Sequence, residues 1–467
     1  MLDRKRVRNF RILLVLGVWE ICYFSGLIDP IRFSHPGGVI DAVIDYTFLR
    51  GFILLLAQLS FAALVGGSMG VGIGSFLIRS RPLSEAVIRL LRIGLWLPFL
   101  ISWAIPISYT GYPDRTALTV WTWIVSSVAV LLYSCYHYQT THVTSGLTWT
   151  EGKLEVIRTS ILQALLIAFI SQVWLGPYGW MYFWSGAEFI ERVYAAGFLL
   201  FVAVTFINDA CSYNFARQAK ARRDIILRTI ASENRKSAID AWLIVLPSLI
   251  IWELLSLSPL DSFISSPSAI LKGGYDFLIF AYYRQSVSWN DTTVSLLEIL
   301  GGLTLAAAGA IVVCQAQSSS PVIKSRVSPF LPITHIVPFI LPLCLNGWLG
   351  AVYVWWTLLT VAAVCFYPCM EVISGLWGSR LPSRILFAFD HALPFAFVAM
   401  IFGEAMSANA GLGFRMMYAR ATHLFPIGLG AALITVVFFI ILSSIFRFTA
   451  KNFFSAEFAH NQKRGQS

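Results

Sequence analysis

Runs of about 20 apolar residues recur along the chain, and they constrain its fold more than any other feature. A helix of about 20 residues crosses a hydrocarbon core of about 30 Å. We count about 12 such spans, centred near residues 17, 64, 98, 127, 166, 202, 249, 303, 338, 359, 395 and 436. Only 12% of the residues are charged, against about 25% in a typical soluble domain. The sequence therefore predicts an all-α, multi-pass membrane protein.

The basic residues indicate how the chain is oriented. When the N-terminus is placed in the cytosol and the spans alternate, 26 of the 34 Lys and Arg residues fall on the cytosolic side. The positive-inside rule describes this asymmetry. The net charge of +10 is therefore explained by orientation in a lipid membrane, and we expect no nucleic acid partner. Both termini are predicted to be cytosolic.

Short motifs of the first half return in the second half, in the same order. The offsets stay between about 229 and 240 residues, and the clearest recurrences are Trp19-Glu20 with Trp252-Glu253, Gly66-Gly67 with Gly301-Gly302, and Tyr133-Ser134-Cys135 with Tyr367-Pro368-Cys369. We interpret the chain as a first repeat (1–216), a basic cytosolic linker (217–236) and a second repeat (237–467). Six spans per repeat is an even number, so the repeats are predicted to be parallel, with a solute pathway between them.

Two features of the repeat favour structural roles. Glu20 and Glu253 recur at equivalent positions, which favours a shared structural bond over recognition of a substrate. The second span of each half is rich in glycine, which lets helix backbones approach closely where lipid supplies no hydrophobic driving force. All seven cysteines lie in or beside apolar spans and are predicted to be small buried hydrophobic residues.

One segment of the second half resembles a known family. It reads Gly403-Glu404-Ala405-Met406-Ser407-Ala408-Asn409-Ala410-Gly411-Leu412-Gly413. This segment is similar to the turn between the last two spans in the membrane permeases of bacterial ABC importers for nitrate, sulfonates and taurine. Two further stretches resemble the same family, Ser265-Ser266-Pro267 after the first span of the second half and Leu381-Pro382 after its cytosolic loop.

The resemblance implies a type I importer permease of the bacterial inner membrane, with both permease halves in one chain. Separate cytosolic ATPase subunits would bind ATP-Mg, so this chain is expected to be neither an enzyme nor the holder of a cofactor or metal. A periplasmic solute-binding protein would deliver a small anion such as nitrate, a sulfonate or taurine. We expect the exterior segments Asp29–Arg50 and Asp261–Asp291 to dock that protein, or to form short helices that cap the bundle.

The cytosolic coupling loop of the family has only a shortened counterpart here. The family pattern is Glu-Ala-Ala, three residues, Gly, and then about nine residues before Ile-x-Leu-Pro, whereas Leu381-Pro382 follows sooner in this chain. The residues predicted to contact the ATPases are Ser145, Gly146 and Leu147 in the first half and Glu371, Ser374, Gly375 and Leu376 in the second.

Ionisable side chains inside apolar spans are costly, and they are functional candidates for that reason. The predicted pathway residues are Glu298, Asp390, His391 and Glu404, with Asp209 a weaker candidate. The competing interpretation is an interhelical hydrogen bond or a position near the lipid headgroups.

Two other classes of function were weighed against the importer permease. An ion-coupled secondary transporter with parallel six-plus-six repeats would move a proton through Glu298, Asp390 or His391. An intramembrane enzyme would need His, Cys, Asp and Glu clustered on neighbouring spans, and the sequence offers no such constellation.

Overall fold

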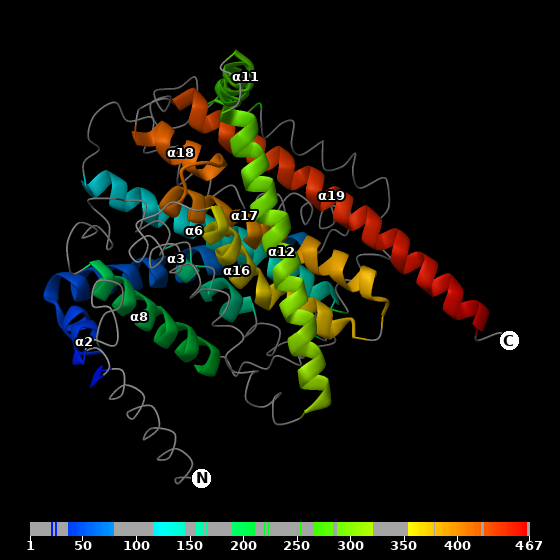
Figure 1. The fold of residues 1–467 in the computed structure, drawn as a ribbon. Coiled ribbons are helices and arrows are strands. Elements are labelled where there is room, and N and C mark those ends of the chain that lie inside the picture. Colours follow the sequence, from blue (N-terminus) through cyan, green and yellow to red (C-terminus); the bar gives the residue numbers. More distant parts are fainter. Residues whose placement is uncertain are drawn as a thin grey trace, which may run out of the picture.

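The computed structural model describes residues 20–21, 24–25, 36–78, 115–144, 156–168 apart from 163 and 167, 189–210, 219, 223, 250, 253–254, 266–283, 287–320, 354–421 apart from 378, and 425–464. Within these ranges the chain is almost entirely helical (Figure 1). The described residues contain no strand, only an isolated bridge between Trp377 and Ser379. The predicted all-α class is confirmed for this part of the chain.

Among the described residues, the labelled helices of the first half are α2 (Pro36–Ile44), α3 (Tyr46–Ile78), α6 (Arg115–Thr144) and α8 (Phe189–Ala210). The long helix α3 packs along α6, and α2 packs against α8. The predicted spans centred near residues 64, 127 and 202 fall in α3, α6 and α8. A shorter apolar stretch, Val156–Leu166, ends at the predicted centre near 166.

In the described part of the second half, the helices are α11 (Pro267–Tyr283), α12 (Val287–Ser319), α16 (Val354–Gly375), α17 (Leu381–Ser407), α18 (Leu412–Ala421) and α19 (Phe425–Arg464). The predicted centres near 303, 359, 395 and 436 fall in α12, α16, α17 and α19. The centres near 17, 98, 249 and 338 lie outside the described residues.

Among the described residues, five helical segments are long and apolar enough to cross a membrane. They are Arg50–Leu77, Asn290–Ser319, Trp355–Gly375, Leu381–Met406 and Gly430–Phe453. Large apolar side chains project outward from them, including Leu64 and Phe76 on α3 and Val312 on α12, each about two-thirds or more exposed. Such outward faces are stable in hydrocarbon and costly in water.

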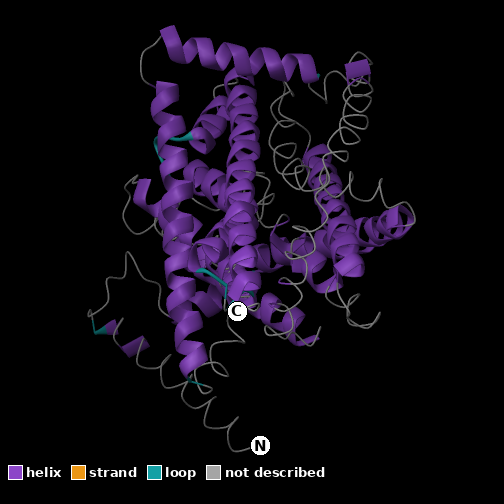
Figure 2. Ribbon diagram, turned by 90° about the vertical axis from the view of Figure 1, so that its right-hand side faces the viewer, coloured by secondary structure: helices purple, strands orange, loops and turns teal. Residues whose placement is uncertain are grey.

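The second half is organised around α16 and α17. These two helices are joined by a short turn over residues 376–380 and pack against each other, with α12 on α16 and α19 on α17. Their shared interior is filled by large buried side chains such as Leu393, Phe397 and Phe402. One helix lies across the ends of the long helices (Figure 2), at the level where Figure 1 shows α11 end-on. The α11 helix packs against the first part of α19 there, as Gly274 approaches Leu433.

Glycine sets how closely the second span of each half approaches its neighbour. A Cβ atom on Gly66 or Gly70 of α3 would collide with backbone carbonyls of α6. A Cβ atom on Gly302 of α12 would collide with Val361 of α16 in the same way. The packing role predicted for these glycines is confirmed.

Each of the two recurring glutamates caps the start of a helix. Glu20 accepts a hydrogen bond of 3.1 Å from the backbone N–H of Gly37, at the start of α2. Glu253 accepts one of 3.0 Å from the backbone N–H of Ser268, at the start of α11. Because the first N–H groups of a helix lack intrahelical partners, a carboxylate there stabilises the helix start. The predicted structural role of this pair is confirmed.

The four cysteines that the structure describes in full are Cys135, Cys314, Cys365 and Cys369, and all are buried free thiols. Cys365 and Cys369 lie in the contact between α16 and α17, with their Sγ atoms 3.7 and 4.0 Å from backbone carbonyls of α17. The prediction of small buried hydrophobic residues is confirmed for these four.

Candidate functional site

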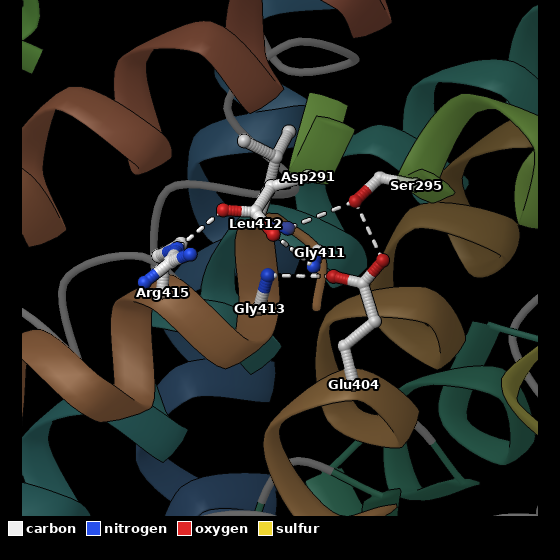
Figure 3. A network of polar contacts seen from close by, with 7 residues as sticks. All are labelled: Asp291, Ser295, Glu404, Gly411, Leu412, Gly413 and Arg415. Carbon is white, nitrogen blue, oxygen red and sulfur yellow. Dashed lines mark hydrogen bonds and ion pairs between the residues drawn. The ribbon is translucent and has the colours of Figure 1, made fainter. Parts of the chain in front are cut away.

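The most elaborate polar contact in the described structure surrounds the turn between α17 and α18. Helix α17 ends at Ser407, and α18 begins at Leu412 after four connecting residues. Gly411 adopts φ 110°, a left-handed conformation that glycine tolerates and other residues rarely adopt. The conformation directs three successive backbone N–H groups, those of residues 411–413, at acceptors on α12 and α17 (Figure 3).

Glu404 is the central acceptor of this site, near the C-terminal end of α17. Its Oε2 atom accepts a hydrogen bond of 2.6 Å from the N–H of Gly413, and its Oε1 atom accepts one of 2.5 Å from the Ser295 hydroxyl. The Ser295 Oγ atom in turn accepts a hydrogen bond of 2.9 Å from the N–H of Leu412. Glu404 and Ser295 are fully buried. The carboxylate therefore fastens the start of α18 to both α17 and α12.

Asp291 completes the site from the first part of α12. Its Oδ1 atom accepts a hydrogen bond of 2.9 Å from the N–H of Gly411, and its Oδ2 atom forms an ion pair with Arg415 of α18. The Arg415 guanidinium also lies beside the rings of Phe414 and Tyr418, 5.6 and 5.9 Å from their centroids. Only 1% of the Asp291 side chain is exposed, so its charge depends on this pairing.

The close fit around Glu404 follows from three glycines. A side chain on Gly411 would overlap the Glu404 carboxylate, and one on Gly413 would overlap the backbone of Ile401. Gly403 lets α17 approach Thr357 of α16, where an added Cβ would lie 2.8 Å from the threonine methyl group. The Gly-rich character of residues 403–413 is thus required by the packing of α16, α17 and α18.

Glu298 lies three residues after Ser295 on α12, and its hydrogen-bonding environment differs from that of Glu404. It is fully buried beside Glu404 and Thr357. Neither of its carboxyl oxygens has a hydrogen-bond partner among the described residues, and the same holds for the Thr357 hydroxyl. A buried polar group without a partner is rare in native proteins, since its desolvation is not offset.

The other two predicted pathway residues belong to separate contacts on α17. Asp390 accepts a hydrogen bond of 2.8 Å from Ser443 and lies 3.6 Å from Arg447, both on α19. His391 Nε2 lies 3.4 Å from Glu371 Oε2 on α16. The structure therefore joins Glu298 with Glu404 and places Asp390 and His391 elsewhere. Asp209 lies at the end of α8.

The predicted coupling residues of the second half lie at the α16–α17 turn. Glu371 and Leu376 are buried, while Ser374 and Gly375 are half-buried. Gly375 ends α16 and lies against the backbone of Ala219, a residue of the basic linker, with no room for a side chain. Ser145, Gly146 and Leu147 lie outside the described residues, and the coupling role of both sets stays a prediction.

Asp291, Ser295 and Arg415 were not among the predicted site residues. A signal for two of them exists in the sequence, because Asp291, Ser295 and Glu298 have i, i+4, i+7 spacing, which places them on one face of a helix. Nothing local in the sequence indicates that this face meets Glu404, which follows more than 100 residues later. In the described parts of the chain, no group of three or more His, Cys, Asp and Glu side chains is arranged to hold a metal ion.

The fold and the apolar helices define the class of this chain as a helical membrane protein. Comparison of the chain with protein-family models, with curated proteins and with solved structures found no match.

Proposed function

We propose that the chain is the permease of an ABC importer in a bacterial inner membrane, with both permease halves fused into one polypeptide. In this proposal the chain has about 12 spans in two parallel repeats, and the solute passes between them. Cytosolic ATPase subunits supply the energy, and a periplasmic binding protein delivers a small anion.

The observation that carries this proposal is the similar packing of the two halves. In each half a glycine-rich second helix packs along the next described membrane helix, α3 on α6 and α12 on α16. The recurring glycine pairs lie at these two contacts, with Gly66 against the backbone of Ser127 and Gly302 against Val361. Together with the equivalent caps made by Glu20 and Glu253, this correspondence supports a duplicated six-helix unit.

The turn between α17 and α18 supports the choice of family. The segment that resembles the importer permeases, residues 403–413, is a tightly fastened turn between two helices of the second half. Each residue type of its Glu…Gly-Leu-Gly pattern has a structural reason, since Glu404 accepts from the backbone of Gly413, and Gly411 adopts a positive φ.

The experiment that tests this function is co-purification of the full-length chain from its native host under mild detergent. We expect an ATPase with a phosphate-binding loop to co-purify in two copies per chain, since each half would offer one contact surface. An exchange of Arg380 at the exposed α16–α17 turn for Glu should lower ATPase recovery without lowering chain recovery. The proposal would be overturned if the chain purifies without any ATPase and this preparation still transports solute.

One observation favours the second candidate, an ion-coupled secondary transporter. Glu298 is a buried carboxyl within α12 without a hydrogen-bond partner among the described residues, which is typical of proton sites in transporters. In proteoliposomes that contain only this chain, solute uptake driven by a pH gradient would support this candidate. Uptake that requires ATP and a second polypeptide would exclude it.

A further inference from the structure

The hydrogen bonds around Glu298 and Glu404 indicate which of the two carboxyl groups holds a proton. Both oxygens of Glu404 accept hydrogen bonds, one from the N–H of Gly413 and one from the Ser295 hydroxyl. The Ser295 oxygen is already an acceptor for the N–H of Leu412, so its single hydrogen is directed at Glu404. A carboxyl group whose two oxygens both accept hydrogen bonds is favoured in its ionised form.

The negative charge of Glu404 is stabilised by its donors alone. It lies at the N-terminus of α18, where exposed N–H groups favour an anion. Arg415, the cation nearest to this turn, is paired with Asp291. The described charged groups near the pair are Asp291 on α12 and Arg415 on α18, and α16 contributes the hydroxyl of Thr357.

A second negative charge beside Glu404 would have no compensation. Like charges in direct contact repel strongly in a buried site, where solvent screens them little. Glu298 is fully buried, and no N–H group or cation among the described residues donates to it. Two carboxyl groups in such contact share a single proton.

We propose that Glu298 and Glu404 form a binding site for one proton, which resides on Glu298, and that release of this proton loosens the turn between α17 and α18. The unpartnered Thr357 hydroxyl is the local group that can accept the Glu298 O–H. When the proton leaves, repulsion from Glu298 displaces the Glu404 carboxylate from Gly413 and Ser295. This proton site does not depend on which solute the chain transports or on ATP as the source of energy.

Infrared spectroscopy of the full-length protein in lipid tests the position of the proton. The wild-type chain should show a C=O stretching band of a buried protonated carboxyl group at neutral pH, and E298Q should lose this band. D390N, which removes a different buried carboxyl from α17, should keep it. E298D is the second variant if E298Q does not fold, and its shorter side chain should shift the band. A wild-type spectrum without the band, or a band that E298Q or E298D leaves unchanged, would overturn the assignment.

Cysteine labelling tests the coupling to the turn. Leu412, the first residue of α18, is buried, so L412C is shielded while the turn is closed and reacts with a maleimide when the turn opens, measured relative to the native cysteines. The labelling rate, corrected for the pH dependence of thiol reactivity with a free cysteine standard, should rise with pH. The rise should approach about tenfold per pH unit below the midpoint of the titration. In L412C/E298Q the corrected rate should not depend on pH, and equal pH dependence in both chains would overturn the coupling.

Discussion

At the scale of single residues, the turn between α17 and α18 is packed so closely that its glycines leave no space for a side chain. Gly411 combines a positive φ with direct contact to the Glu404 carboxylate. Asp291 exposes only 1% of its side chain, while its partner Arg415 exposes 20%. The charge of Asp291 is thus buried, whereas that of Arg415 reaches toward the surface. Removal of one partner therefore differs in its effect from removal of the other.

Gly411→Ala should destabilise the folded chain by more than about 1–2 kcal/mol. The left-handed conformation alone costs an alanine that amount, and its methyl group would also overlap Glu404. Thermal unfolding of the purified protein in detergent measures the effect. The control is Gly72→Ala, where an added Cβ meets nothing within 4 Å, and it should be neutral or stabilise the helix slightly. Equal melting temperatures for the two variants would contradict this expectation.

Asp291→Ala and Arg415→Ala should show a coupling of about 1–3 kcal/mol in a double-mutant cycle of unfolding. Asp291→Ala leaves the N–H of Gly411 without its acceptor, and Arg415→Ala leaves a buried carboxylate uncompensated. A second cycle on Asp390 and Arg447, which lie 3.6 Å apart with more exposed side chains, serves as the comparison. It should give the smaller coupling, since solvent screens that pair more.

At the scale of helices, the glycine faces of α3 and α12 determine which helices pair. Without a hydrophobic force between helices in lipid, close approach of backbones provides the van der Waals contact that stabilises the pair. Gly66 faces the backbone carbonyl of Ser127, whereas a Cβ atom added at its neighbour Gly67 would make only an ordinary contact of 3.9 Å with Ser134. Adjacent residues of the same type thus have different roles.

Gly66→Ala should separate α3 from α6 and lower the melting temperature, while Gly67→Ala should not. Gly302→Ala, which would place a methyl group against Val361, should act on α12 and α16 as Gly66→Ala acts on the first half. Overpacking of this kind typically costs about 1–3 kcal/mol. Thermal unfolding monitored by far-UV circular dichroism gives the comparison. A loss of stability from Gly67→Ala as large as that from Gly66→Ala would contradict the proposed packing.

At the scale of the whole molecule, the parallel orientation of the two halves is the property that most needs a direct test. Parallel repeats place equivalent exterior segments on the same side of the membrane. Ser34 and Ser265 precede the helices capped by Glu20 and Glu253, and are equivalent in this sense.

The single variants Ser34→Cys and Ser265→Cys should both react with a membrane-impermeant maleimide added to intact cells whose outer membrane is permeabilised. Ser232→Cys in the basic linker should react only after lysis, because the positive-inside rule places this linker in the cytosol. The native chain without added cysteine gives the background. Reaction of only one of the two exterior variants would contradict parallel repeats.

Part of the fold and of the site was predictable because it depends on local chemistry. The centres of seven predicted spans fall in helices of the described structure, since an apolar run of about 20 residues needs no distant partner to be recognised. Glu404 and Glu298 were found as acidic residues within apolar runs. The i, i+4, i+7 face of Asp291, Ser295 and Glu298 was visible in principle, but its partner was not.

The amino-acid sequence by itself determined that this chain is helical and crosses a membrane, because hydropathy and backbone hydrogen bonding within each helix are local properties. It also indicated, through recurrence along the chain, that the glycine-rich second spans pack closely and that Glu20 and Glu253 make a structural bond. Only the tertiary structure decided that Glu404 fastens the start of α18 and lies beside Glu298. That contact joins residues more than 100 positions apart, and the crossing of α12, α16 and α17 alone brings them together.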